Sequence, residues 1–141
     1  EGTPVVYVLD RHDPDDSDLE DWGEHAVEGS EGAEVWPPLA PADGDRLVTK
    51  PSYSSFFASK LEAVLEELAV DTIELTGCST ETQLLATATD ALQLGFAVEV
   101  PRELQAGTTA EAEEAALKTM HFLAPYKPSR KARLARVAAR A

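Results

Sequence analysis

The chain has 141 residues, a length that suits a single domain with a core of its own. Hydrophobic residues make up 43% of the sequence, which excludes a disordered chain, and no apolar run approaches the roughly 20 residues that span a bilayer. The net charge of −14 makes nucleic acid a poor partner, because an acidic surface repels phosphate. Nothing at the start is typical of a secretion signal. We therefore expect a cytoplasmic globular protein without nucleic-acid or membrane partners.

The first predicted element is a strand at residues 4–9, a nearly continuous apolar run rich in β-branched side chains. Such a run is typical of a strand buried on both faces. The strand ends at Asp10, and a loop-like stretch rich in Asp, Gly and Pro continues to residue 45. Because a loop of this length is rarely structural filler in a compact domain, we expect it to carry function.

Strands and helices alternate through the rest of the chain. The predicted elements are a strand at residues 47–49, a helix from Ser54 or Ser55 to about Leu68, a strand at residues 72–77, a helix at residues 80–94 stopped by Gly95, a strand at residues 96–100, and a helix from Thr108 or Thr109 to Leu123. This order predicts one α/β domain over residues 1–141, with a Rossmann-like central parallel sheet and helices on both faces as three layers. Six of the 12 basic residues follow Tyr126, so residues 126–141 are predicted to form a basic C-terminal helix.

Polar side chains that suit chemistry follow the ends of the predicted strands. Asp10, Lys50 and Cys78 each stand just past such an end, where sites form in parallel sheets. Asp10 with His12 and His25 offers one carboxylate and two imidazoles, a ligand set for Zn²⁺ or Fe²⁺, although ordinary loop residues give the same pattern. Cys78, the single cysteine, is either a small buried hydrophobe or a reactive thiol, and we expect it to be partly buried.

A resemblance to a known family rests on four segments in a consistent order. They are Asp10-x-His12, then Trp22-x-x-His25-x-x-x-Gly29-x-x-Gly32-Ala33-Glu34, then Lys50-x-x-Tyr53-Ser54-x-Phe56, and Thr76-Gly77 leading to Ala86-Thr87-Ala88-x-Asp90-Ala91 and Gly95-Phe96. In this order and spacing the chain resembles the nicotinamidase and isochorismatase superfamily over most of its length. The resemblance implies the isochorismatase-like hydrolase fold.

The resemblance also implies a site. Amidases of this family use an Asp–Lys–Cys triad, in which the cysteine attacks a carboxamide carbon and backbone amides near it stabilise the oxyanion. By resemblance Lys50 is the triad lysine, the divalent metal is held by the residues matching Asp10, His12 and His25, and Trp22 lines the substrate pocket. Tyr53 and Ser79 are further candidate substrate contacts. Because relatives often form oligomers, a homo-oligomer is expected.

The sequence departs from the family pattern at the nucleophile. Counting back from Ala86, the family's cysteine falls on Gln83, which cannot attack a carbonyl, and Cys78 stands five residues earlier. The family's first strand, which carries the catalytic Asp, and its following helix would precede Pro4, so the single domain is expected to lack them. Lys50, Cys78 and Gln83 are accordingly the candidate catalytic positions.

Three functions remain open from the sequence. The first is a metal-dependent amidohydrolase acting on nicotinamide or a similar small carboxamide, with Cys78 as nucleophile. The second is an isochorismatase-like vinyl ether hydrolase, which needs no thiol. The third is a catalytically impaired relative that serves as a binding or oligomerisation module. In the hydrolase readings, Lys50→Ala is expected to abolish turnover with little effect on stability.

Overall fold

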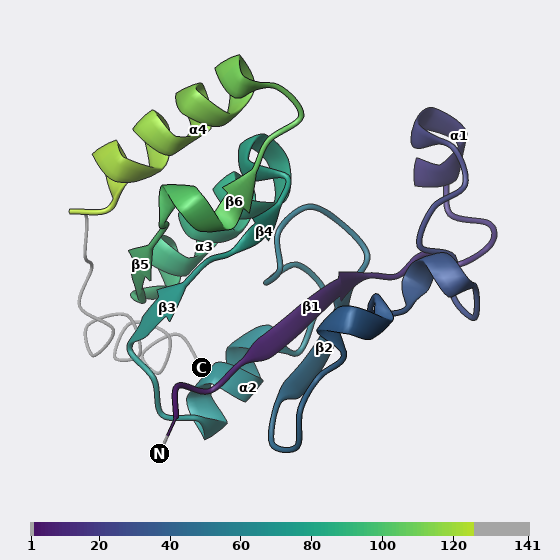
Figure 1. Cartoon of the computed structure of the whole chain (residues 1–141), viewed down its shortest axis with the longest axis horizontal. Helices are drawn as coiled ribbons and strands as arrows, with labels where there is room; N and C mark the ends of the chain where they lie inside the picture. Colours follow the sequence, from purple (N-terminus) through teal and green to yellow (C-terminus); the bar gives the residue numbers. More distant parts are fainter. Residues whose placement is uncertain (1, 126–141) are drawn as a thin grey trace, which may run out of the picture. The chain divides into compact units, whose positions relative to one another are not determined.

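The computed structural model describes residues 2–125 and divides the chain into two compact units, Glu1–Leu68 and Ala69–Ala141. Each unit is an arrangement of short parallel strands and helices (Figure 1). The basic segment predicted to be helical, residues 126–141, lies outside the described residues. Within the part of the chain that is described, no helix has the length and apolar character needed to cross a membrane.

The first unit is built around the strand pair β1 (Val6–Asp10) and β2 (Arg46–Lys50). The two strands run side by side (Figure 1) and are parallel, in a register that places Val6 opposite Arg46 and Asp10 opposite Lys50. The predicted strands and the long connection between them are present, and the connection holds the short helix α1 (Asp18–Trp22) and two 3₁₀ turns. Strand β1 is half-buried rather than buried on both faces, because β2 is its one partner strand among the described residues.

Helix α2 (Leu61–Glu67) is shorter than predicted. It begins six residues after Ser55, because serine side chains bond the backbone locally and turn the chain before the helix starts. Ser54 Oγ accepts from Phe56 N at 3.3 Å, and Ser59 Oγ accepts from Leu61 N at 3.2 Å. Leu61 and Leu65 are its buried residues, as expected for an amphipathic helix with a stripe at i and i+4.

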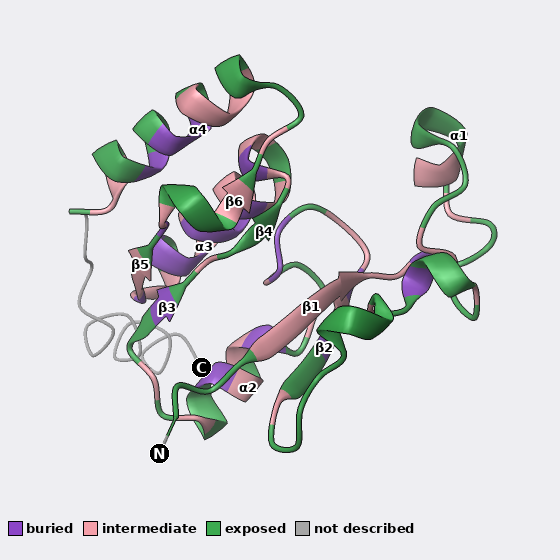
Figure 2. Cartoon of the chain, in the orientation of Figure 1, coloured by how far each residue is buried: buried purple, intermediate pink, exposed green. Residues whose placement is uncertain are grey.

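The second unit contains two parallel strand pairs and two longer helices. Strand β3 (Thr72–Glu74) pairs with β5 (Ala97–Glu99), and β4 (Gly77–Cys78) pairs with β6 (Gln105–Ala106). Helix α3 (Leu85–Leu94) packs against α4 (Ala110–Leu123), and Figure 2 shows buried residues on both. The core cluster combines Ala88, Val100, Leu117 and Met120, all at most 7% exposed. Burying each large apolar side chain contributes roughly 1.5–3 kcal/mol.

Helix boundaries in the second unit follow the predicted capping residues. Gly95 ends α3 with φ of 89°, a left-handed conformation that glycine adopts without strain. Thr109 begins α4, and its hydroxyl accepts from Ala112 N at 3.1 Å, which confirms the predicted N-cap. The predicted helix start at Thr80 is instead a π-helical turn over Thr80–Leu84 that leads into α3.

The α/β class is confirmed, since all the strand pairs between residues 2 and 125 are parallel and helices lie between them in sequence. The described residues form three two-stranded sheets where the sequence predicted one continuous sheet. The predicted strand at residues 72–77 is divided, because β3 pairs with β5 while Gly77–Cys78 pairs with β6. The two-residue strand β6 has too little alternation to be found from the sequence.

Candidate functional site

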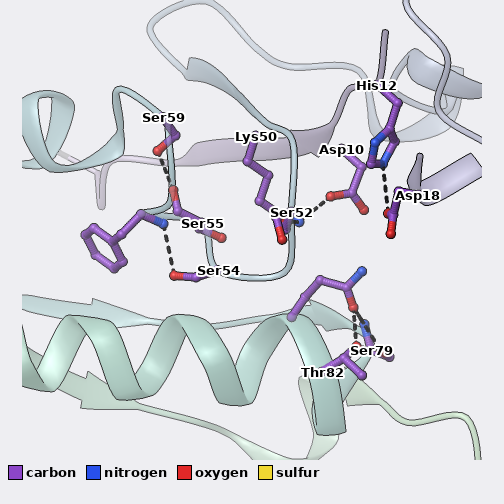
Figure 3. A network of polar contacts seen from close by, with 12 residues as sticks. Asp10, His12, Asp18, Lys50, Ser52, Ser54, Ser55, Ser59, Ser79 and Thr82 are labelled. Atoms are coloured by element: carbon purple, nitrogen blue, oxygen red, sulfur yellow. Dashed lines mark hydrogen bonds and ion pairs between the residues drawn. The ribbon is translucent and has the colours of Figure 1, made fainter. Parts of the chain in front are cut away.

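Lys50 and Asp10 form a partly buried ion pair at the carboxyl ends of β1 and β2. Parallel pairing puts the two residues opposite each other, and the Lys50 ammonium donates to the Asp10 carboxylate (Figure 3). The same ammonium donates to the carbonyl of Ser52 at 2.7 Å. The Lys50 side chain is 4% exposed and that of Asp10 is 28% exposed. The lysine side chain is therefore held in a fixed, largely water-excluded position.

A group suited to a metal ion lies in the long connection of the same unit. Ligand atoms of His12, Asp18 and His25 all lie within 4.8 Å of one another, and His12 Nε2 is 3.9 Å from Asp18 Oδ2 (Figure 3). Tetrahedral ligands about 2.0–2.2 Å from a zinc ion are roughly 3.3–3.6 Å apart, so the side chains would close by about an ångström on binding. Two imidazoles and one carboxylate are donors that Zn²⁺ and Fe²⁺ accept.

The carboxylate that lies within 4.8 Å of both histidines is that of Asp18, which the sequence did not suggest. We expected Asp10 beside His12 and His25, and the assignment of Asp10 as a metal ligand remains a prediction. Asp10 itself lies opposite Lys50 in the strand register and forms an ion pair with the Lys50 ammonium. The alternation of side chains in an extended segment does not reveal that a charged partner stands on the neighbouring strand.

Backbone hydrogen bonds explain how two histidines that are 13 positions apart converge. His12 N donates to Ala26 O at 3.0 Å, and Glu28 N donates to His12 O at 2.9 Å, which makes an isolated parallel bridge between His12 and Val27. This bridge brings His25 beside His12, with ring centroids 4.6 Å apart. The His12 side chain is 2% exposed, so the ring has a defined place in the packed connection.

Asp16 contacts two residues of the metal group, which is the set of His12, Asp18 and His25, but does not belong to that group. Its Oδ2 lies 3.0 Å from His12 Nδ1, and its Oδ1 accepts from Asp18 N at 3.1 Å. The hydrogen bond with His12, followed by that from the Asp18 backbone, holds the pKa of the Asp16 carboxyl below its ordinary value. The carboxylate is thus the form present at neutral pH.

In the second unit, Gln83, the position where the resemblance predicts the nucleophile, is a hydrogen-bonded side chain. Gln83 Oε1 accepts from Ser79 N at 3.1 Å, from Ser79 Oγ at 2.9 Å and from Thr82 Oγ1 at 2.6 Å. Three donors on one oxygen are an arrangement that stabilises a carbonyl or an oxyanion. Here the oxygen that receives them belongs to the protein itself.

Cys78 and the candidate substrate contacts are more exposed than the ion pair. Cys78 is a free thiol and is exposed, so the expectation of partial burial is wrong; β4 ends at this residue and leaves the side chain at the surface of its unit. Trp22, at the end of α1, is 68% exposed and Tyr53 is 43% exposed. Their predicted roles as substrate contacts, like that of Ser79, remain predictions.

A comparison with protein-family models identifies the family of the chain. The model described as the isochorismatase domain matches residues 1–128. The chain belongs to the isochorismatase family. Among its relatives, the maleamate amidohydrolase of Pseudomonas putida is 36% identical over 123 residues, a match that covers 82% of this chain and 58% of the relative. The nicotinamidase/pyrazinamidase of Mycobacterium tuberculosis is 31% identical over 109 residues, covering 70% of this chain and 58% of the relative.

Solved structures of the isochorismatase family share the fold. An isochorismatase-like hydrolase from Alkaliphilus metalliredigens matches with a TM-score of 0.81 and 30% identity, and the match covers 89% of this chain and 68% of the hydrolase chain. A pyrazinamidase of Pyrococcus horikoshii in complex with zinc matches with a TM-score of 0.79 and 27% identity, covering 86% and 72%. The chain spans about three fifths of the length of the first curated relatives it matches.

Two residues of the site were missed from the sequence of this isochorismatase-family chain. Asp16 and Asp18 lie four and six residues after His12, in a stretch where acidic residues are frequent. The usable signal was the spacing of four residues between His12 and Asp16, which a turn closed by Asp16 N and Asp13 O brings side by side. Frequent acidic residues nearby hid this signal.

Proposed function

We propose that this isochorismatase-family chain carries the site of a metal-dependent amidohydrolase acting on nicotinamide or a similar small carboxamide. The observation that carries the proposal is the convergence of His12, Asp18 and His25 in the same unit as the partly buried pair of Lys50 and Asp10. Relatives named as amidohydrolases and nicotinamidases support the same reaction class. A bound Zn²⁺ or Fe²⁺ would act as a Lewis acid, accepting an electron pair from a ring nitrogen or a carbonyl oxygen of the substrate.

The reaction that we propose passes through a thioester. The Cys78 thiolate adds to the carboxamide carbon, the C–N bond breaks, and the nitrogen leaves as ammonia after gaining a proton. Water then adds to the thioester carbon, releasing the carboxylic acid and restoring the thiol. Exposure of the Cys78 thiol supports its assignment as the nucleophile, because a buried thiol could not reach a substrate.

A second candidate function is favoured by Gln83. The donors of Ser79 and Thr82 that would stabilise an oxyanion already bind the Gln83 amide oxygen. A chain with this arrangement can bind a small carboxamide through its metal group without hydrolysing it. This is the catalytically impaired relative that the sequence left open, with binding as its function.

Release of ammonia from nicotinamide and maleamide-type substrates in the presence of Zn²⁺, Fe²⁺ or Mn²⁺ tests the two candidates. For the amidohydrolase we expect slow metal-dependent release that His12→Ala and Cys78→Ser abolish. His121→Ala is the matched control, since this exposed histidine of α4 lies outside the metal group and should leave the rate unchanged.

The outcomes separate the candidates. Turnover that persists in Cys78→Ser would contradict the thiol assignment. No turnover in the wild type together with turnover in Gln83→Cys would identify the natural chain as the impaired relative. No turnover in either protein and no metal binding would contradict both proposals.

A further inference from the structure

The two histidines of the metal group can each bind a metal through Nε2 if the other ring nitrogen carries the proton. For His25 the backbone fixes this choice, because Nδ1 lies 2.7 Å from the carbonyl of Gly23 and a carbonyl can only accept. The Nδ1–H therefore donates, and the lone pair of the neutral ring is on Nε2.

For His12 a side chain takes the role of the carbonyl. Nδ1 lies 3.0 Å from Asp16 Oδ2, at hydrogen-bond distance, whereas Nε2 faces Asp18 Oδ2 at 3.9 Å, beyond hydrogen-bond distance. A carboxylate is an acceptor without a proton, so the proton of a neutral His12 ring belongs on Nδ1. The lone pair then points from Nε2 toward the Asp18 carboxylate.

The second oxygen of Asp16 acts on Asp18. Asp16 Oδ1 accepts from the Asp18 backbone N–H at 3.1 Å, and Leu19 N donates to the Asp16 carbonyl at 3.1 Å. These bonds form the turn that leads into α1 and set the backbone of Asp18. One carboxylate thus orients two of the three residues of the metal group.

We propose that Asp16 is the positioning residue of the metal centre, holding His12 in the Nδ1–H tautomer and Asp18 at the start of α1 so that both face one ion. The inference rests on the proposed metal-binding function. Outer carboxylates that accept from a ligating histidine fix its tautomer and orientation, and their loss weakens metal binding by about 10–100-fold.

The first test needs no metal. Nitrogen-15 chemical shifts of the imidazole rings are measured in the metal-free 141-residue chain at about pH 8, where an ordinary histidine is neutral. We expect His12 to have a protonated Nδ1 and an unprotonated Nε2 in the wild type, and Asp16→Ala to move the proton toward Nε2. Exposed His121 is the reference within the same sample, and its shifts should be equal in all variants.

The second test measures the affinity for Zn²⁺ by competition with a chelating dye. We expect Asp16→Ala to weaken binding by about 10–100-fold, Asp16→Glu to recover part of the loss, and Asp15→Ala to stay within about threefold of the wild type. Asp15 is the matched control, an exposed aspartate beside Asp16 that is outside the metal group.

The two measurements keep the failures apart. A wild type in which His12 carries its proton on Nε2, or an Asp16→Ala variant with unchanged tautomer and unchanged affinity, would overturn the role of Asp16. A wild type with the expected tautomer that binds no Zn²⁺ would overturn the proposed metal centre, while the effect of Asp16 on the His12 ring would still be measured.

Discussion

Lys50 combines burial with charge, and this combination makes it both a candidate site residue and a structural one. Its side chain is 4% exposed, and its ammonium donates to Asp10 and to the Ser52 carbonyl. Breaking a buried pair leaves a charge without compensation, which costs about 3–5 kcal/mol for full burial and less where one partner reaches water. Asp10 is 28% exposed, so a smaller loss applies here. These contacts lead us to expect a measurable loss of stability when Lys50 is replaced, and the small effect expected from the sequence remains a prediction.

We predict that Lys50→Met lowers the free energy of unfolding by about 1–3 kcal/mol, because the Asp10 carboxylate loses its ammonium partner. Urea denaturation measures the change. Lys60→Met is the matched control, since Lys60 is exposed at the start of α2, and it should stay within about 0.5 kcal/mol of the wild type. In a double-mutant cycle, Asp10→Asn should cost less in the Lys50→Met background than alone. Strictly additive losses would contradict the coupling of the two side chains.

The residues of the metal group show which candidate ligands can be predicted from the sequence and which cannot. His12 and His25 were found as a pair because imidazoles are rare in this chain, which has three. Asp18 and Asp16 were not, because 26 acidic residues offer many equivalent choices. The hydrogen bond between His12 and Asp16, the 3.9 Å from His12 Nε2 to Asp18 Oδ2, and the turn into α1 single out these two carboxylates.

At the scale of elements, the predicted helices and strands agree best with the structure where a backbone constraint is local. Gly95 and Thr109 mark helix ends correctly, because a left-handed residue and a capping hydroxyl act on their own neighbours. The start of α2 was placed too early, since Ser54 resembles a helix cap but bonds within a turn. Strand β6 depends on its pairing with β4, a contact between distant segments that no local pattern encodes.

The Glu81 side chain, in the π-helical turn before α3, forms hydrogen bonds with Thr108, which lies just before α4. Glu81 Oε1 accepts from Thr108 N at 2.9 Å and from the Thr108 hydroxyl. These hydrogen bonds, the hydroxyl's first, lower the pKa of the Glu81 carboxyl below its ordinary value. A depressed carboxyl pKa contributes stability above the pKa of the unfolded chain, near 4.3, and this contribution is lost as the pH falls through the folded-state value.

We predict that Glu81→Gln lowers the melting temperature at pH 7 by on the order of 2–4 °C, and that the difference from the wild type shrinks as the pH is lowered to about 3, because the Glu81 carboxyl gains its proton as the pH falls through its lowered pKa. Thermal unfolding followed by circular dichroism across this range measures the difference. Glu103→Gln controls for the loss of one exposed negative charge. A difference that is the same at both pH values would show that the carboxylate form of Glu81 has no special role.

At the scale of the whole molecule, the candidate catalytic and metal-binding residues are divided between the two compact units. The metal group and the Lys50–Asp10 pair belong to Glu1–Leu68, and Cys78 with the Gln83 turn belongs to Ala69–Ala141. The sequence predicted the class of the fold from its alternating elements, and its assignment of a single domain over residues 1–141 remains a prediction. Contacts within each unit, such as the core around Leu117, depend on side-chain packing that the pattern does not specify.

This division leads to a prediction about where a metal ion stabilises the chain. A ligand that binds only the folded form adds about 2.7 kcal/mol to the free energy of unfolding when its concentration is 100 times its dissociation constant. Amides that exchange through unfolding should then exchange roughly 100-fold more slowly. All three residues of the metal group lie in the first unit. We therefore expect Zn²⁺ to slow hydrogen exchange at the amides of His12, Asp18 and Glu28, which form the bonds that bring the ligands together, by up to about 100-fold. The amides of α3 should slow much less.

His25→Ala provides the control for this exchange experiment, because it removes one ligand while keeping the backbone bridge between His12 and Val27. In this variant Zn²⁺ should slow the same amides by less than about threefold, since a group reduced to two ligands binds zinc weakly. Addition of a chelator should return the wild-type rates to their metal-free values. Equal slowing of the first-unit amides and those of α3 would contradict a stabilisation confined to the unit that holds the ligands. An effect that persists in His25→Ala would show that zinc binds elsewhere on the chain.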